Sequence, residues 1–262
     1  MIKYEQLENI SLNTSTLGKL TLTEEGKALG HIPGWKMLVD PAYRSNGTKG
    51  LRNRALPGNF LVGTEDIVDK TFQNGAAGFS STSVGYSNAP LANFNINPTE
   101  WTYFGVLEAS VVTNTSFLAR SIMGPGGDEV GLYIFITASG ALAIDSKQPA
   151  PPYVYRLRSK DWVLGQSAGA KLLMITFSVE KGLKLYINGG LSAENTTDTQ
   201  PLTASLVAAG AFRLFQQTPS DLENPIVFGN QGFLDIDLSK TENIGYRKQI
   251  ERFMKTKYGI AA

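Results

Sequence analysis

Residues 171–192, KLLMITFSVEKGLKLYINGGLS, decide the fold of this chain. Two runs rich in branched and apolar residues, 172–179 and 183–188, flank the short polar segment 180–182, which ends in glycine. In the second run apolar and polar residues alternate, as they do in a strand with one buried and one exposed face. The stretch therefore predicts a β-hairpin in an antiparallel sheet with one solvated side. A further turn is expected at Asn188-Gly189-Gly190.

Short apolar runs of the same kind recur along the chain, separated by segments rich in glycine and proline. They predict strands at 35–39, 101–112, 117–123, 130–137, 141–145, 212–216, 226–229 and 232–238. The glycine-rich segments 34–63 and 72–90 are expected to be mainly loops at the surface. Three prolines in 146–159 restrict that segment to a loop or an edge strand, because proline cannot donate to a β-ladder. The pattern is typical of an all-β sandwich of two antiparallel sheets.

The C-terminus has the signature of an α-helix over 240–258. Ser239 followed by Glu242 predicts a capping box, which satisfies two backbone amides at the helix start. Tyr246, Ile250, Phe253 and Met254 form an apolar stripe, and Gly259 predicts the helix end. The positive charges of the helix are spread over its other faces. A helix packed across the sandwich rim is favoured over one that binds a membrane or nucleic acid.

Residues 1–33 differ from the sandwich domain that is expected over 34–262. Apolar residues alternate there with Ser, Thr and Asn, which predicts two short strands or an extended arm. Thr23 is a candidate N-cap for a single helical turn up to Gly30. Two interpretations stay open: a first strand packed on the main sheet, and an arm that docks on a neighbouring subunit.

Composition excludes several classes of function. The chain has no cysteine, which excludes disulfides, thiolate metal sites and thiol nucleophiles. Its 24 Lys and Arg against 23 Asp and Glu provide no general attraction to nucleic acid or an anionic membrane. No apolar run approaches the roughly 20 residues that span a bilayer, and charged residues stand where a signal peptide has its apolar core. We expect no nucleic-acid partner and no membrane partner.

Several segments resemble the laminin-G-like members of the concanavalin A-like lectin and glucanase superfamily. The similar features are the turn Tyr186-Ile187-Asn188-Gly189, the helix start Leu238-Ser239, the terminal Lys257-Tyr258-Gly259 and the strand within NFNINPTEWTYFGVLEASV (93–111). The resemblance covers about 34–260 and concerns fold more than activity. It implies a jelly-roll β-sandwich, and members with such a terminal helix often occur on phage particles or in adhesins.

The superfamily includes glucanases, whose activity depends on paired catalytic carboxylates. Glycoside hydrolysis needs two carboxyl groups on opposite sides of the scissile bond. Asp235 and Asp237 are nearest to this pattern, but no glutamate leads them. The single histidine, His31, has no G-x-S-x-G motif to serve, and GPGGDEVG lacks the lysine of a phosphate-binding loop. We therefore expect no enzyme activity.

Binding residues can still be nominated. Sugars stack on exposed aromatic rings that are flanked by polar groups. Tyr153, Tyr155 and Trp162, with Arg156 between them, are the candidates for a carbohydrate site, although packing explains Trp162 equally well. No cofactor is expected. Calcium, which the family sometimes binds at the sandwich rim, is the one ion left open, with Asp128, Asp221 and Asn224 as candidate ligands.

These observations predict a non-catalytic structural or attachment protein of a phage particle, such as a capsid decoration protein or a head or tail-fibre component. It would lie on the virion surface as a homo-oligomer, with the arm contacting other virion proteins. The alternative is a free-standing carbohydrate-binding module or adhesin, outside the cell or on its surface, that binds a cell-surface glycan.

Overall fold

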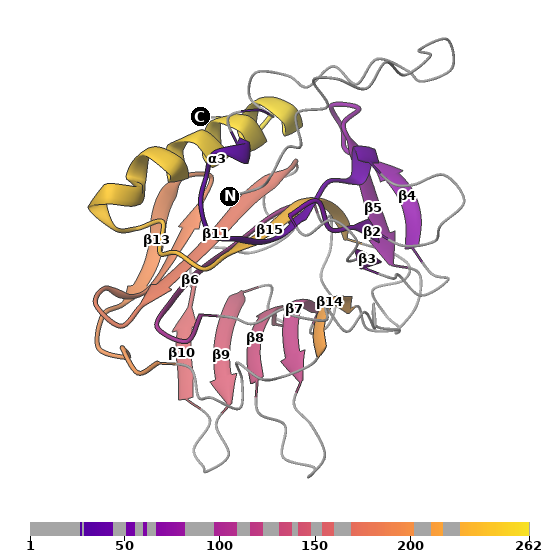
Figure 1. The fold of residues 1–262 in the computed structure, drawn as a ribbon. Helices are drawn as coiled ribbons and strands as arrows, with labels where there is room; N and C mark the ends of the chain where they lie inside the picture. Colours follow the sequence, from indigo (N-terminus) through magenta and orange to yellow (C-terminus); the bar gives the residue numbers. More distant parts are fainter. Residues whose placement is uncertain are drawn as a thin grey trace.

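The computed structural model describes residues 27, 29–43, 51–55, 60–61, 67–81, 97–108, 116–122, 131–137, 141–147, 154–159, 169–201, 211–216 and 226–261. Within them the chain forms two antiparallel β-sheets and a C-terminal α-helix. In Figure 1 the larger sheet lies between the helix and the smaller sheet. The predicted all-β sandwich with a C-terminal helix is confirmed. Residues 1–26, which make up most of the predicted arm, lie outside the described residues.

The larger sheet has 8 strands in the order β13-β12-β11-β6-β15-β5-β4, with β1 paired to β15 beside this path. Their bounds are β1 Trp35–Val39, β4 Ile67–Thr71, β5 Ala77–Ser81, β6 Glu100–Glu108, β11 Lys171–Ser178, β12 Gly182–Ile187, β13 Gly190–Asn195 and β15 Val227–Leu234. The predicted hairpin is β11–β12, and β11 also pairs with β6 along its whole length. After β12, Asn188 and Gly189 both have positive φ, so the expected turn forms and leads into β13.

The smaller sheet has 5 strands in the order β10-β9-β8-β7-β14. Their bounds are β7 Ser116–Ile122, β8 Gly131–Ile136, β9 Leu142–Lys147, β10 Val154–Arg158 and β14 Ala211–Gln216. The proline-containing segment supplies β10, which lies at the sheet edge as expected. A short ribbon pairs β2 Leu51–Arg52 with β3 Phe60–Leu61, and a 3-10 turn, η1, spans Pro41–Tyr43.

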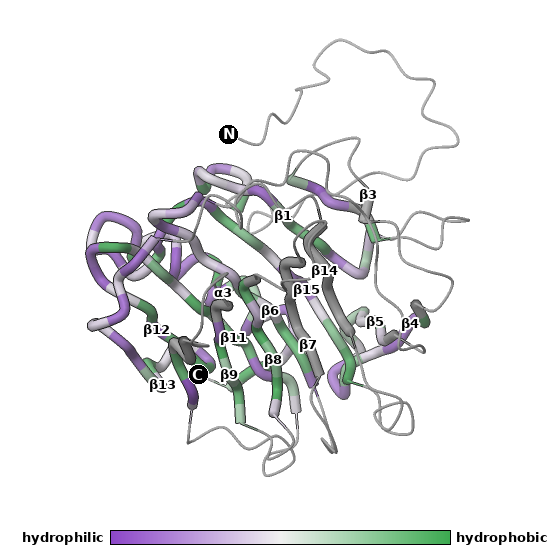
Figure 2. Tube along the Cα trace, turned by 90° about the horizontal axis from the view of Figure 1, so that it is seen from below, coloured by the Kyte–Doolittle hydropathy of each residue, from purple (hydrophilic) through white to green (hydrophobic). Residues whose placement is uncertain are grey.

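An aromatic and aliphatic core fills the space between the two sheets. Trp101 of β6 stacks on Phe177 and Phe233 of the neighbouring strands, with ring centroids 5.8 and 5.7 Å apart. The smaller sheet contributes the inward residues of β8 and β9, namely Leu132, Ile134, Ile136, Leu142 and Ile144. Figure 2 shows hydrophobic residues along β8 and β9 of the smaller sheet and along β6 and β11 of the larger one. This face of the larger sheet is therefore closed to solvent.

One buried polar pair interrupts this core. The Tyr103 hydroxyl donates to Gln231 Oε1 at 2.6 Å, and Gln231 Nε2 donates to the Val106 carbonyl at 3.0 Å. Gly105 makes room for this amide, because a Cβ at that position would collide with Gln231 Oε1. Burial raises the pKa of Tyr103 well above its usual range, so the hydroxyl stays a hydrogen-bond donor.

The opposite face of the larger sheet is also buried, which corrects the expectation of a solvated side. Leu172, Met174 and Tyr186, on the outward side of β11 and β12, pack beneath the helix α3 Ile244–Tyr258. The helix contributes its apolar stripe with Ile250 and Met254 fully buried. It lies over the sheet face and not at the sandwich rim (Figure 1). Alternation alone could not show that a later segment covers the less apolar face.

The start of the helix also differs from the prediction. A 3-10 turn, η3 Thr241–Asn243, precedes α3, and no side chain caps either element. Ser239 Oγ has no hydrogen-bond partner in the described part of the chain. The turn is instead organised by Asp237, whose carboxylate accepts from the Ser239 amide at 2.7 Å and from the Ser178 hydroxyl at 2.6 Å. The predicted end is confirmed, since Gly259 adopts the left-handed conformation and its amide donates to the Lys255 carbonyl.

Two other expectations were wrong in detail. The runs at 226–229 and 232–238 form the single strand β15, and the chain bends away from the sheet after Leu234. Segment 72–90 is not only surface loop, because β4 and β5 form a hairpin at one end of the larger sheet.

At the start of the described chain, Leu29 and Ile32 are buried against the outer face, and the Trp35 indole donates to the Leu29 carbonyl.

Candidate functional site

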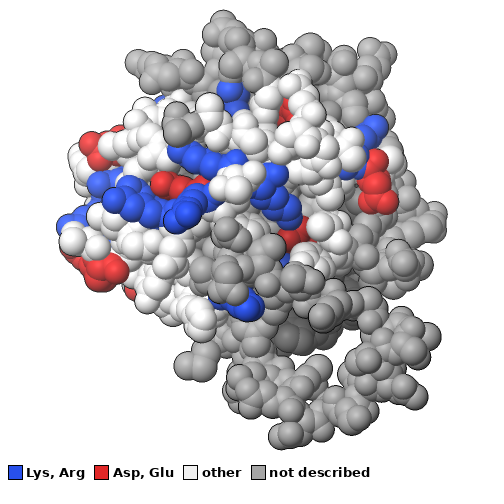
Figure 3. Space-filling model, turned by 90° about the horizontal axis from the view of Figure 1, so that it is seen from above, with Lys and Arg blue, Asp and Glu red and all other residues white. Residues whose placement is uncertain are grey.

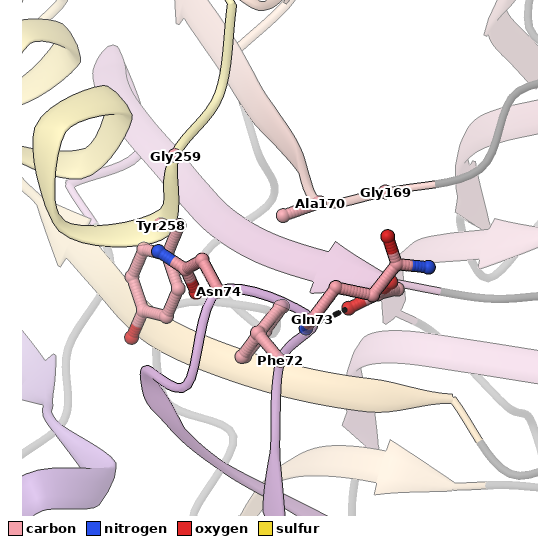
Figure 4. Close-up of a pocket in the computed structure, with 8 residues that line it drawn as sticks. Phe72, Gln73, Asn74, Gly169, Ala170, Tyr258 and Gly259 are labelled. Atoms are coloured by element: carbon pink, nitrogen blue, oxygen red, sulfur yellow. Dashed lines mark hydrogen bonds between the residues drawn. The ribbon is translucent and has the colours of Figure 1, made fainter.

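A cleft opens on the outer face of the larger sheet where the helix ends. Its volume is about 280 Å³, near the lower end of the range for small-ligand pockets. Three elements form it: the β4–β5 turn, the end of β6 with the start of β11, and the C-terminus of α3 (Figure 4). The lining residues are Phe72, Gln73, Asn74, Glu108, Gly169, Ala170, Tyr258 and Gly259.

The β4–β5 turn is held rigidly against the end of the helix. Its backbone closes through the Phe72 amide to the Ala76 carbonyl at 2.9 Å and the Gly75 amide to the Phe72 carbonyl at 2.8 Å. Asn74 uses both ends of its side chain: Oδ1 accepts from the Ala76 amide, and Nδ2 donates to the Lys257 carbonyl at 3.0 Å. The turn and the helix C-terminus therefore form one wall. Neighbouring residues of the turn have fixed positions.

The floor of the cleft follows from strand alternation. Phe104, Val106 and Glu108 of β6 share the outward face, and the first two are buried under the helix. Glu108 comes next in this row and is only half-buried, because the helix ends before it. Its Oε2 accepts from the Gln73 backbone amide at 3.4 Å, a long contact that leaves the carboxylate able to accept further hydrogen bonds.

Two aromatic rings support the wall from below. The rings of Phe72 and Tyr258 are 4.7 Å apart, and both side chains are buried. The Tyr258 hydroxyl donates to Asn230 Oδ1 and accepts from the Asn230 amide at 2.8 Å. Burial raises the pKa of Tyr258 above its usual range.

A buried ion pair lies beside Tyr258. Lys257 Nζ donates to Asp40 Oδ1 at 2.7 Å and to Asn230 Oδ1 at 2.8 Å, and Arg54 is 3.6 Å from the same Asp40 carboxylate. Burial lowers the pKa of Lys257, while the neighbouring Asp40 charge acts in the opposite direction. The network joins the last turn of α3 to β1 and β15. The cleft therefore stands on a preorganised support.

The cleft can bind a ligand by hydrogen bonds but lacks a reaction centre among its described residues. Glu108 is the one carboxylate that lines it, so the second group of a hydrolytic pair is not present there. The Gln73 side chain is exposed, and its amide has no partner among the described residues. An exposed side-chain amide and a carboxylate with remaining acceptor capacity, held on a packed aromatic support, suit a ligand with several hydroxyl groups.

The sequence-predicted carbohydrate residues are only partly described. Tyr155 and Arg156 lie on the edge strand β10, where the Tyr155 backbone is opposite Asp145 of β9. Tyr153 and Trp162 lie outside the described residues. Arg158, at the end of β10, has an exposed side chain. Whether these residues form one site stays a prediction.

The predicted calcium ligands Asp128, Asp221 and Asn224 all lie outside the described residues, so that proposal is untested. In the described part of the chain, no three His, Asp or Glu side chains gather to hold a metal ion. Asp235 and Asp237, which the predicted strand 232–238 would have included, lie beyond the end of β15 at Leu234. Asp235 pairs with Lys36 at 2.7 Å, which gives it a structural role.

The outward side of α3 carries a basic surface, which we define as Lys248, Arg252 and Lys255. Figure 3 shows these cations gathered along the helix with an acidic group among them. The acidic group is Glu251, 3.4 Å from Arg247, whose guanidinium lies over the Tyr186 ring. None of the described helices has the length and apolar character that a membrane span requires.

Sequence reasoning missed the cleft. Its β4–β5 turn, DKTFQNGAAGF (69–79), contains Asn74-Gly75 between residues that suit strands, which is a hairpin signal. That signal could have placed the turn. Its meeting with Glu108 and Tyr258, 34 and 184 residues further along the chain than Asn74, is a property of the fold.

The fold and the cleft define a β-sandwich domain with a small polar site on the outer face of one sheet. No protein-family model matches the chain. No curated protein is similar to it in sequence. Solved structures do share its fold. The botulinum neurotoxin serotype D ligand-binding domain, solved in complex with N-acetylneuraminic acid, has a TM-score of 0.54 at 15% identity, over 83% of this chain and 51% of that one.

Two related structures give similar values. The receptor-binding domain of a botulinum neurotoxin C/D mosaic serotype has a TM-score of 0.54 at 15% identity, over 83% of this chain and 52% of that one. The receptor-binding domain of botulinum neurotoxin D gives 0.53 at 13% identity, over 83% and 53%. The chain thus spans about half the length of these neighbours. At such identities the likeness shows the β-sandwich fold, and membership of the laminin-G-like family stays a prediction.

Proposed function

We propose that this chain is a non-catalytic carbohydrate-binding domain whose ligand lies in the cleft between the β4–β5 turn and the start of β11. The observation that carries the proposal is the cleft itself: among its described residues, the Gln73 side-chain amide and the Glu108 carboxylate can accept or donate further hydrogen bonds, on a support that contains two packed aromatic rings. Groups held in place before binding lose little entropy on binding. Additional support comes from the fold, because one neighbour of the same fold was solved with N-acetylneuraminic acid.

A glycan array followed by titration calorimetry tests the proposal. The full chain should bind a defined set of glycans, and Gln73→Ala should weaken that binding about tenfold through loss of one or two hydrogen bonds. The matched control is Gln249→Ala, which removes an exposed amide from α3 outside the cleft and should leave the affinity unchanged. Equal affinities for the two variants would contradict the assignment of the site.

The phage-particle attachment role is a second proposal, and it concerns the arm. Leu29 and Ile32, which follow most of the predicted arm in sequence, are buried against the outer face of the larger sheet. Removal of residues 1–26 should leave a folded monomer and abolish self-association or attachment to other virion proteins. Light scattering after gel filtration measures the first effect. A truncated chain that still assembles contradicts the role of the arm.

A further inference from the structure

The charge of the cleft restricts which sugars it can accept. Among the described residues that line it, Glu108 alone carries a charged side chain. The nearest cation in sequence, Lys257, contributes only its carbonyl to the turn, since its ammonium is bound to Asp40 and Asn230. The cleft therefore presents negative charge with no compensating cation from its described walls.

Strand alternation keeps a second cation out of the cleft. Lys171 follows the lining residue Ala170 on β11 and pairs with Leu107 of β6. Leu107 faces the core between the two sheets, and residues paired across a ladder share a face. Lys171 thus belongs to the inner face of the sheet, while Glu108 belongs to the outer face.

The basic surface of α3 lies elsewhere on the molecule. Its cations line the exposed side of the helix (Figure 3), whereas the cleft begins past the helix C-terminus at Gly259. Acidic sugars carry a carboxylate or a sulfate, which needs Arg, Lys or several N–H donors for tight binding. Beside Glu108 such a group meets a like charge in a partly desolvated site.

From this geometry we infer that the cleft takes an uncharged sugar and that Glu108 is its specificity-determining residue, an inference that rests on the carbohydrate-binding function proposed above. Two adjacent hydroxyl groups of a neutral sugar donate to the Glu108 carboxylate, and the side-chain amide of Gln73 forms a hydrogen bond with a third hydroxyl group. The carboxylate that strengthens these bonds is the group that repels acidic sugars.

The test compares neutral, sialylated and sulfated glycans on one array at about 0.15 M salt, where long-range charge effects are screened. The full chain should bind neutral glycans only. Glu108→Gln should weaken that binding about tenfold, because a neutral amide accepts weaker hydrogen bonds. Glu108→Lys should abolish it and raise the affinity for sialylated glycans at least about tenfold. Glu242→Lys, an exposed charge reversal before α3, is the control and should change neither.

Each contrary result has its own meaning. Binding of sialylated or sulfated glycans by the unchanged chain overturns the inference and leaves the carbohydrate-binding function standing. Neutral binding that neither Glu108 variant alters, with folding verified by circular dichroism, also overturns it. If no glycan on the array binds, the proposed function itself fails and the inference with it.

Discussion

The two faces of the larger sheet are built from the same alternating strands but end differently. On the inner face, Trp101, Phe177 and Phe233 stack in a core that the smaller sheet closes. On the outer face, 15 residues of α3 cover about 22 Å of the sheet, and the cover stops at Tyr258. The last turn of the helix holds a largely buried ion pair, and the cleft opens where the helix ends. This difference indicates that the length of α3 determines which polar groups of the outer face are accessible to a ligand.

The largest expected effect tests the closed face. Trp101→Ala should destabilise the protein by about 3–5 kcal/mol, because it leaves a cavity between two rigid sheets. Met254→Ala, on the helix, should cost about 2–3 kcal/mol, since a single helix can shift to fill part of the space. Urea unfolding followed by circular dichroism measures both. A larger loss of stability for Met254→Ala than for Trp101→Ala would contradict the proposed difference between the two faces.

The ion pair at the end of the cover comes next. Asp40→Asn should cost about 2–3 kcal/mol, because it leaves the charge of Lys257 largely buried without its partner. Changing both residues, with Lys257→Met added, should recover part of that loss, since the Lys257 charge is then gone and only the charge of Arg54 is left without its partner. The control is Glu180→Gln, which removes a surface partner of Lys181 and should leave stability unchanged. Additive losses in the double variant would show that the pair is not coupled.

The preceding prediction concerns Asp40, a buried carboxylate that is paired with Lys257. In Asp145 of β9, burial outweighs the effect of the neighbouring cation. Burial raises its pKa from 3.8 to about 6, although Arg158 lowers it. The folded state then holds a proton that the unfolded chain releases, so stability falls as pH rises from about 4 to 6. Asp145→Asn should therefore raise stability at pH 7.5 by about 1 kcal/mol or less, allowing for solvent screening, and have no effect at pH 3. Thermal unfolding at both pH values checks this. A gain that is the same at both pH values would exclude ionisation as its cause.

The smallest effect concerns the other end of the helix cover. Ser239→Ala should change stability by less than about 0.5 kcal/mol, whereas loss of a true N-cap costs about 0.5–2 kcal/mol. Asp237→Ala should cost more than this, since its carboxylate accepts from both Ser178 and Ser239. Denaturant unfolding of the two variants side by side decides it. A cost above 1 kcal/mol for Ser239→Ala would restore the capping box.

Local signals predicted most of the sandwich. The hairpin at 171–192, the turn at Asn188-Gly189 and the helix end at Gly259 depend on residues close in sequence, and all three are confirmed. The predicted capping box was wrong because the Asp237 carboxylate, two residues before Ser239, accepts a hydrogen bond from the Ser239 backbone amide in a competing turn. The sequence predicts two strands in place of β15 because Gly229 and Gly232 resemble turn residues. In the structure both glycines stay in the strand, where they make room for neighbouring aromatic rings.

The site could not be predicted in the same way. Gln73 and Glu108 belong to no recognisable motif. The pairing of β5 with β15 and of β15 with β6, together with the packing of the end of α3 on the β4–β5 turn, brings them close to Tyr258. The outer face was expected to be solvated because Lys184, Tyr186 and Asn188 look polar. A helix some 60 residues later buries Tyr186 beneath Arg247. Sequence periodicity shows which residues share a face, and it is silent on what covers that face.

The most direct test of the central claim is a crystal structure of the full chain with the strongest glycan from the array. We predict a sugar ring in the cleft, with hydrogen bonds to the Gln73 side-chain amide and the Glu108 carboxylate and with Ala170 on the opposite side. A glycan bound instead along β10, at Tyr155 and Arg156, or on the basic surface of α3 would contradict it.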